Sequence, residues 1–108
     1  MAFKSLGKIT VTSAGTPVRA TANESTPTAR YPVQMVRVTA PTGNSGANIY
    51  VGASGFSKST YAGLYGIVPK GTYQDFLIAL APEGILANEI FLDADTTNDV
   101  ALVSISEQ

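Results

Sequence analysis

The feature that most constrains this chain is a two-residue alternation of apolar and polar side chains that recurs along most of its length. In residues 7–12, Ile9 and Val11 alternate with Lys8, Thr10 and Thr12. The same alternation marks residues 33–40, 48–52, 73–80, 89–94 and 100–105. A period of two with Val, Ile, Thr and aromatic residues is typical of β-strands, whose successive side chains point to opposite faces.

One face of these expected strands carries most of the branched aliphatic side chains, and we expect it to form the core. The residues on that face are Ile9, Val11, Val36, Val38, Ala40, Ile49, Val51, Phe76, Ile78, Leu80, Ile90, Leu92, Ala101, Val103 and Ile105. Phe91, Asp93 and Leu102 fall on the opposite face of their strands.

Turn-forming residues separate the expected strands. They cluster at residues 13–17, 41–46, 69–71, 82–84 and 93–99, where Gly supplies positive φ, Pro presets φ, and Asn and Asp bond their own backbone. The one candidate helix, residues 81–88, holds Pro82 and Gly84, so we expect at most one turn there. Turn signals about every ten residues without intervening helices predict an antiparallel all-β sandwich or barrel.

Length and composition limit how such strands are organised. The chain has 108 residues, which predicts one domain over residues 1–108 with one modest core. Only 14% of the residues are charged, well below the usual share of about a quarter. A chain with so little charge gains little solubility from repulsion, so we expect an assembly to cover part of its surface.

The composition also argues against most catalytic and ligand-binding classes. The chain has no His and no Cys, which removes the commonest bases, thiol nucleophiles and transition-metal ligands. We therefore expect no enzyme, no cofactor and no metal site. The net charge is −1 and the seven basic residues are scattered, so we expect neither nucleic acid nor a membrane surface as partner. No apolar run approaches the roughly 20 residues of a membrane span and the N-terminus lacks an apolar signal region, so we expect synthesis inside a cell.

Two short motifs suggest nucleotide or nucleophile chemistry, but each has a simpler interpretation. Ser57 and Lys58 are adjacent, so their side chains are expected to point apart and not to form a catalytic dyad. Residues 52–59 (GASGFSKS) lack the Gly directly before Lys58 that a phosphate-binding loop requires. We interpret both as parts of a Gly/Ser loop.

Acidic residues suggest two further kinds of site. In residues 93–99 (DADTTND), Asp93, Asp95 and Asp99 resemble part of a calcium loop, but Asn98 and Ser104 replace the required Gly and Glu. We interpret the segment as a turn held by Asx bonds, with a weak surface cation site as the alternative. Candidate glycosidase carboxylates are Asp75, Glu83, Glu89 and Asp93, but so short a chain has little mass with which to build a sugar cleft. The sequon Asn23-Glu24-Ser25 accepts a glycan only in a secretory pathway.

Two loops are the expected sites of partner binding. Residues 21–32 are polar and hold two Pro residues, which indicates a long loop or an arm able to add to a neighbour. Residues 53–66 place aromatic rings between three Gly residues, and rings on a pliable backbone suit contact surfaces. The expected contact residues are Glu24, Thr26, Arg30 and Tyr31 in the first loop, and Phe56, Tyr61 and Tyr65 in the second.

The order of segments from Arg30 onward resembles a family of small phage structural proteins. The likeness is carried by Val38-Thr39-Ala40-Pro41, Asn48-Ile49-Tyr50-Val51-Gly52, Gly66-Ile67-Val68-Pro69-Lys70-Gly71 and Glu89-Ile90-Phe91-Leu92-Asp93-Ala94-Asp95. The strand at residues 76–80 and the insert at residues 81–86 depart from the pattern. The resemblance implies a jelly-roll-like antiparallel β-sandwich of about seven or eight short strands.

The same resemblance implies a role in the virion. Members of the family decorate or cement an icosahedral head, and others sit in the tail or neck. The chain is accordingly expected to bind the major capsid protein or other virion proteins on the capsid surface, as a dimer or trimer, after synthesis in the host cytoplasm. The alternatives are a tail, neck or fibre component, and a carbohydrate-binding module for host attachment that uses Tyr50, Tyr61 and Tyr65.

Overall fold

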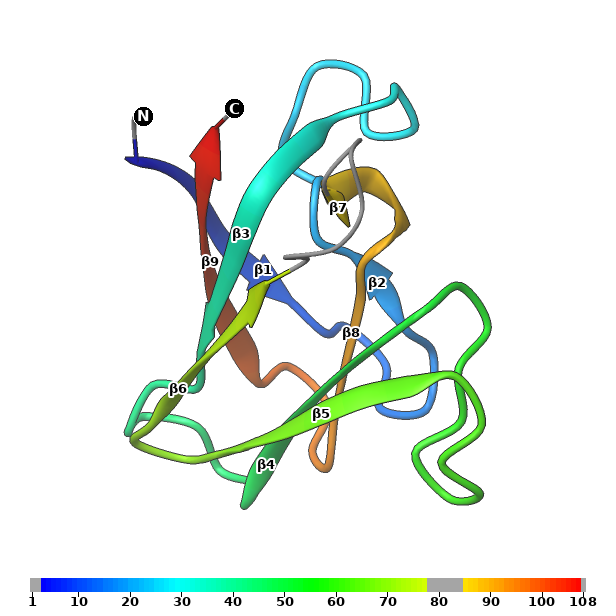
Figure 1. The fold of residues 1–108 in the computed structure, drawn as a ribbon. Coiled ribbons are helices and arrows are strands. Elements are labelled where there is room, and N and C mark those ends of the chain that lie inside the picture. Colours follow the sequence, from blue (N-terminus) through cyan, green and yellow to red (C-terminus); the bar gives the residue numbers. More distant parts are fainter. Residues whose placement is uncertain (1–2, 78–84, 108) are drawn as a thin grey trace.

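The alternating segments form antiparallel strands in the computed structural model, which describes residues 3–77 and 85–107 (Figure 1). The strands are β1 (Phe3–Thr10), β2 (Val18–Arg19), β3 (Pro32–Thr39), β4 (Asn48–Gly52), β5 (Leu64–Pro69), β6 (Tyr73–Leu77), β7 (Ile85–Leu86), β8 (Phe91–Ala94) and β9 (Val100–Glu107). A short 3-10 helix, η1 (Ala87–Glu89), lies between β7 and β8. The predicted all-β class is confirmed.

The strands form two sheets that pack face to face. The first sheet has the order β1-β9-β3-β6, with β7 also pairing with β3, and the second has the order β2-β8-β4-β5. Four of the pairs are nested in the sequence: β4 with β5, β3 with β6, β2 with β8 and β1 with β9. Nested antiparallel pairs arise when one long hairpin rolls over on itself, which is the jelly-roll arrangement. The expected jelly-roll-like sandwich is therefore confirmed.

The outermost nested pair brings the two ends of the described chain together. Phe3 of β1 lies opposite Ser106 of β9, and the pairing continues to Thr10 opposite Val100. The marks N and C accordingly stand beside one another at one end of the sandwich (Figure 1).

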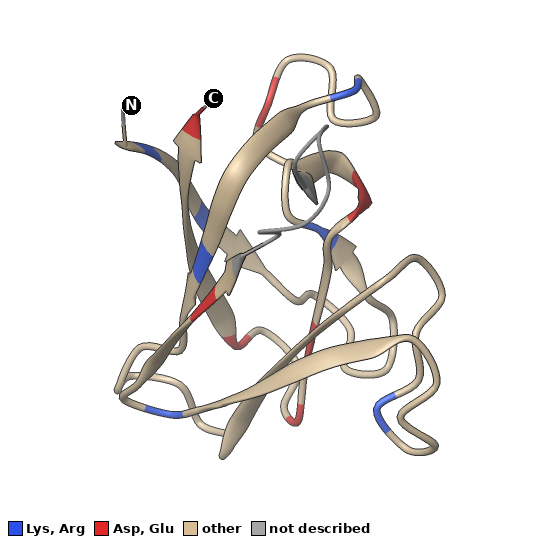
Figure 2. Ribbon diagram, viewed as in Figure 1, with Lys and Arg blue, Asp and Glu red and all other residues tan. Residues whose placement is uncertain are grey.

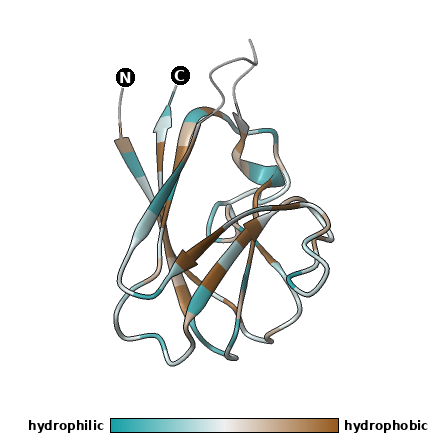
Figure 3. Cartoon of the chain, turned by 60° about the horizontal axis from the view of Figure 1, so that its bottom comes forward, coloured by the Kyte–Doolittle hydropathy of each residue, from teal (hydrophilic) through white to brown (hydrophobic). Residues whose placement is uncertain are grey.

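The core lies between the sheets and uses the faces that the alternation predicts. Its buried residues include Ile9, Val11, Val36, Val38, Ala40, Ile49, Val51, Ile90, Leu92, Ala101, Val103 and Ile105. Phe76 is half-buried and packs against this cluster, while Leu102 is exposed on the opposite face. Hydrophobic residues concentrate on the strands, whereas the connecting loops are mainly neutral or hydrophilic (Figure 3).

Two sequence predictions fall partly outside the described residues. The strand expected at residues 73–80 is present as β6, but Ile78 and Leu80 lie in the segment 78–84 that the structure does not describe. Of the candidate helix at residues 81–88, the described part holds η1, which is a single turn.

Candidate interaction surface

The loop between β4 and β5, residues 53–63, is a closed unit with its own hydrogen bonds. Ala53 N donates to Gly63 O at 2.9 Å, which joins the two ends of the loop, and Ser57 N donates to Ala62 O at 3.0 Å. The Ser57 hydroxyl accepts the N–H groups of Ser59 and Thr60. A loop whose ends meet and whose interior is bonded presents its side chains in defined positions.

Phe56 anchors this loop from beneath. Its side chain is only 5% exposed, and it lies so close to Gly52 of β4 that a Cβ on Gly52 would come within 2.6 Å of the ring. We expected Phe56 to present its ring to a partner. The ring is instead buried under its own loop, so in the folded chain it holds the loop against β4. The alternation of apolar and polar residues holds only for strands, so it could not predict the burial of a loop residue such as Phe56.

Lys58 fastens the same loop to the second sheet. Its Nζ donates to Ala94 O of β8 and lies 5.8 Å from the centroid of the Tyr50 ring. The Ser57 and Lys58 side chains thus bond to different groups, and both serve to hold the loop.

We call four aromatic and apolar residues of this loop and its two flanking strands the tyrosine surface: Tyr50, Tyr61, Tyr65 and Ile67. Tyr50 and Ile67 are opposite one another across β4 and β5, and Tyr65 precedes Ile67 on the same face of β5. Tyr61 and Tyr65 are 62% and 54% exposed. The rings of Tyr61 and Tyr65 are therefore free to contact a partner while their backbone is fixed.

Tyr50 joins the tyrosine surface to the turn between β8 and β9. Its hydroxyl donates to Asp95 Oδ1 at 2.8 Å. Partial burial raises the pKa of Tyr50, and the bond to Asp95 raises this pKa further, with a smaller effect from Tyr61. The phenol therefore stays protonated over the physiological range and acts as a hydrogen-bond donor.

Tyr61 holds an unusual backbone conformation. Its φ is 65°, in the left-handed region that bulky residues rarely adopt. Strain of this kind concentrates at functional positions, where the side chain is needed in spite of its conformational cost. The strain at Tyr61 thus marks the same residue that has the most exposed ring of the tyrosine surface.

The loop predicted as an arm folds back on its own domain. Between β2 and β3 it spans residues 20–31, and Lys4 Nζ of β1 contacts both Glu24 Oε1 at 3.4 Å and the Tyr31 hydroxyl at 3.1 Å. These two bonds raise the pKa of Lys4, the Tyr31 bond more than the Glu24 bond. Thr26 and Arg30 are exposed on the same loop. Figure 1 places this loop and the 53–63 loop in different parts of the sandwich, so the structure does not bring the two predicted contact sets together.

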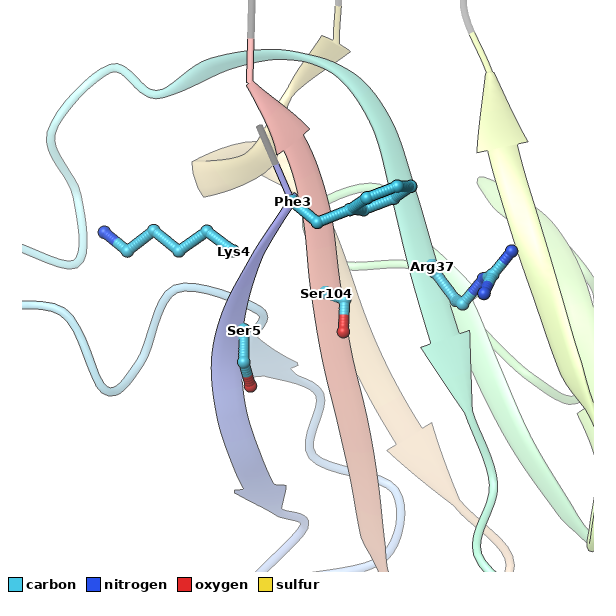
Figure 4. A pocket seen from close by; sticks show the side chains of 5 residues that line it. All are labelled: Phe3, Lys4, Ser5, Arg37 and Ser104. Carbon is cyan, nitrogen blue, oxygen red and sulfur yellow. The ribbon is translucent and has the colours of Figure 1, made fainter. Parts of the chain in front are cut away.

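The outer face of the first sheet holds exposed apolar side chains that lie outside the two loops expected to bind a partner. They are Phe3, Tyr73 and Leu102. A shallow depression of about 300 Å³ on this face is lined by Phe3, Lys4, Ser5, Arg37 and Ser104 (Figure 4). A strand-by-strand alternation identifies such a face as non-core, but only the sheet order shows which of its residues become neighbours.

An ion pair crosses the same face. Arg37 Nε and Nη2 donate to the two carboxylate oxygens of Asp75 at 2.7 and 3.0 Å, and the guanidinium lies 4.3 Å from the centroid of the Tyr73 ring. The paired hydrogen bonds lower the pKa of Asp75 and raise that of Arg37. Asp75, one of the candidate glycosidase carboxylates, is therefore held in an ion pair with Arg37.

The three Asp residues of the 93–99 segment bond to distant segments: Asp93 and Asp99 to two different loops, and Asp95 to the start of β4. Buried Asp99 accepts the N–H groups of Ser45 and Gly46 at 2.8 and 2.7 Å. Buried Asp93 accepts Gly15 N at 2.9 Å, and Asp95 accepts Asn48 N at 3.1 Å. These bonds are long-range, so the three carboxylates link the segment to other parts of the fold, whereas the local Asx bonds that we expected would stay within the turn itself. They also explain why Asp93 is buried although it lies on the outer face of β8.

No other chemical cluster is found in residues 3–77 and 85–107. Among these residues, no group of three or more His, Cys, Asp or Glu side chains is placed to hold a metal ion. Glu89 is exposed, and Glu83 lies outside the described residues. Basic and acidic residues are spread over several elements (Figure 2). No helix within the described part of the chain is long and apolar enough to cross a membrane.

Comparison of the chain with protein-family models, with curated proteins and with solved structures finds no match.

Proposed function

We propose that this chain is a phage head decoration protein that docks on the major capsid protein lattice through its tyrosine surface. The observation that carries the proposal is the presentation of Tyr61 and Tyr65, whose rings are both more than half exposed. The backbone of Tyr61 belongs to the loop that Phe56 and Lys58 hold in place, and Tyr65 lies on β5, which pairs with β4. The resemblance of the strand sequences to small phage structural proteins supplies the class of partner.

The arrangement suits protein docking for an energetic reason. Tyr rings bury large area with few rotatable bonds, and residues of this kind dominate the binding energy of protein interfaces. A loop that is already ordered loses little conformational entropy when it binds. Each copy then needs only a modest affinity, because a shell of many copies bridging capsid joints stabilises the head collectively.

The jelly roll itself is compatible with this role but does not specify it. Jelly rolls occur in viral capsid proteins and also in lectins and cupins, so a fold of this kind supports many functions. The proposal therefore depends on the surface and on the sequence resemblance, and a direct binding experiment is needed.

The experiment mixes the purified chain with expanded heads assembled from the major capsid protein of the same genome. Bound chain is counted by co-sedimentation. We expect saturable binding at a simple ratio to the capsid subunit, and heads that resist heating better when the chain is bound. The Tyr61→Ser/Tyr65→Ser double variant should lose this binding. Tyr73→Ser is the matched control, because Tyr73 is 59% exposed but lies on the first sheet.

The other outcomes separate the alternatives. Equal binding by the parent and the double variant would keep the decoration role and move the docking face elsewhere. Failure to bind heads, with rings or tubes forming from the isolated chain, would favour a neck or tail component. Failure to bind or assemble, with binding to a glycan array that requires Tyr61 and Tyr65, would favour the host-attachment module.

A further inference from the structure

The long edge of the first sheet is β1. It has eight residues and is the outermost strand of its sheet. The outermost strand β2 of the second sheet has only two residues, and β5 ends at Pro69, which has no N–H group. An outermost strand presents unpaired N–H and C=O groups to any extended segment, so a long one is normally covered or paired.

The ladder with β9 identifies the groups that face the open side of β1. Val11 N donates to Asp99 O at 2.9 Å immediately beyond the strand. Residues of an antiparallel strand alternate between bonding toward the neighbour and facing away from it. Ile9 therefore bonds toward β9, and the N–H and C=O of Lys8 face the open side.

Asn23 covers these groups from the loop at residues 20–31. Its Nδ2 donates to Leu6 O at 3.2 Å and to Lys8 O at 3.0 Å. An amide nitrogen has two hydrogens, so both are used on the strand edge. The intervening Gly7 has φ 87° at a bulge, and a Cβ there would lie 3.1 Å from the Asn23 nitrogen. Glycine at this position lets the amide approach the edge.

The loop that carries Asn23 is itself held in place. The Thr21 hydroxyl donates to Pro27 O at 2.6 Å, and Tyr31 N donates to Asn88 Oδ1 at 3.0 Å. Lys4 contacts Glu24 and Tyr31 from β1. Hydrogen bonds within the loop and to its neighbours therefore hold Asn23 against the strand edge, and the loop is not a flexible arm.

We infer that the β1 edge is a strand-acceptor site that the chain closes with its own Asn23, and that the occupant excluded in this way is β1 of a second copy. Two copies present the same eight-residue edge, and antiparallel pairing across a two-fold axis is self-complementary. Such pairing needs the Lys8 carbonyl that Asn23 occupies. The inference does not depend on the proposed function. It concerns how the β1 edge keeps copies of the chain apart, and not how the tyrosine surface docks on a partner.

The experiment opens the edge and measures association. Asn23→Ala removes the amide, and Asn23→Asp keeps its shape but replaces its donors by a charged acceptor. Thr26→Ala, on the exposed part of the same loop, is the matched control. By sedimentation velocity over increasing concentration, we expect the control to match the parent. Both Asn23 variants should form a concentration-dependent species of twice the parent mass.

A second change tests whether this association uses β1. Lys8→Pro removes the N–H that faces the open side and leaves the β9 ladder intact. Added to Asn23→Ala, it should restore the parent mass, with circular dichroism confirming that every variant is folded. Folded Asn23 variants that keep the parent mass at all concentrations would overturn the inference. So would larger species that persist in the double variant.

Discussion

Tyr61 combines an exposed ring with an unfavourable backbone conformation, and the two can be separated by substitution. Asn tolerates the left-handed region better than other non-glycine residues, whereas Ala does not. We expect Tyr61→Asn to exceed Tyr61→Ala in free energy of unfolding by about 1 kcal/mol, measured by urea denaturation. Both variants lack the ring, so both should dock less well. Equal stability of the two variants would mean that the conformation at residue 61 carries no strain.

Asp75 gives the stability a defined acid dependence. Its bonds to Arg37 lower its pKa in the folded state, below the value of about 3.9 for an unfolded Asp. A lowered folded pKa contributes stability that is present above the unfolded pKa and is lost as the pH falls through the folded pKa. We therefore expect Asp75→Asn to lower the urea midpoint at neutral pH and to flatten the loss of stability below about pH 4. If Asp75→Asn lost stability below about pH 4 as steeply as the parent, the acid sensitivity would belong to another carboxylate.

At the scale of elements, the 53–63 loop depends on Phe56. Truncation of a buried Phe to Ala costs about 3–5 kcal/mol where the structure cannot relax. Because the Phe56 ring lies outside the main core cluster, we expect the loss to appear as local opening of the loop. Trypsin should cut Phe56→Ala rapidly after Lys58, while the parent resists because Lys58 is half-buried and bonded to Ala94.

Tyr61→Ala is the control for that experiment, since Tyr61 is exposed and its removal leaves the anchor intact. Rapid cleavage of this control would show that the loop depends on the exposed ring as well. If Phe56→Ala resisted trypsin, the loop would be held by Lys58 and its backbone bonds alone.

Strands and their core faces were readable from the sequence because period two is a local property of the chain. Ile49 and Val51 are buried in β4 as the alternation predicts. Residues 64–66, which we expected at the end of a loop, instead begin β5, so Tyr65 lies on a strand. The local rule fails where a distant element covers an outer position. Asp93 is buried because the loop around Gly15 crosses it, and Phe56 is buried because its loop folds onto Gly52.

At the scale of the whole molecule, carboxylates join the loops at one end of the sandwich. Asp99 connects the start of β9 to Ser45 and Gly46 in the loop before β4. Asp99→Ala would leave two N–H groups without their acceptor, and each such loss costs about 1–3 kcal/mol. We expect a decrease of about 2–6 kcal/mol in the free energy of unfolding, measured by urea denaturation.

Asp95→Ala provides the comparison, because Asp95 is exposed and its bonds compete with water. The effect of Asp95→Ala should be clearly smaller than that of Asp99→Ala. A reversed order would mean that the solvent-facing bond to Tyr50 contributes more than the buried bonds of Asp99.

The order of strands within the sheets is the part of the fold that alternation could not predict. Pairing between β1 and β9 joins segments that are far apart in the sequence. The local sequence of either strand does not identify the other as its partner. The sequence resemblance supplied the jelly-roll expectation that periodicity left open between a sandwich and a barrel. It could not supply the cover of the β1 edge, which depends on one amide of the Asn23 side chain.

Because Phe3 and Ser106 lie side by side, the chain enters and leaves the sandwich at nearly the same point. A chain that enters the sandwich along β1 leaves it along β9, at a distance close to the spacing of about 4.8 Å between neighbouring strands. The sandwich can therefore be inserted into a surface turn of another protein with little disturbance of that turn, much as a hairpin is inserted. For the same reason, cargo fused to either end would emerge from the same corner of the sandwich.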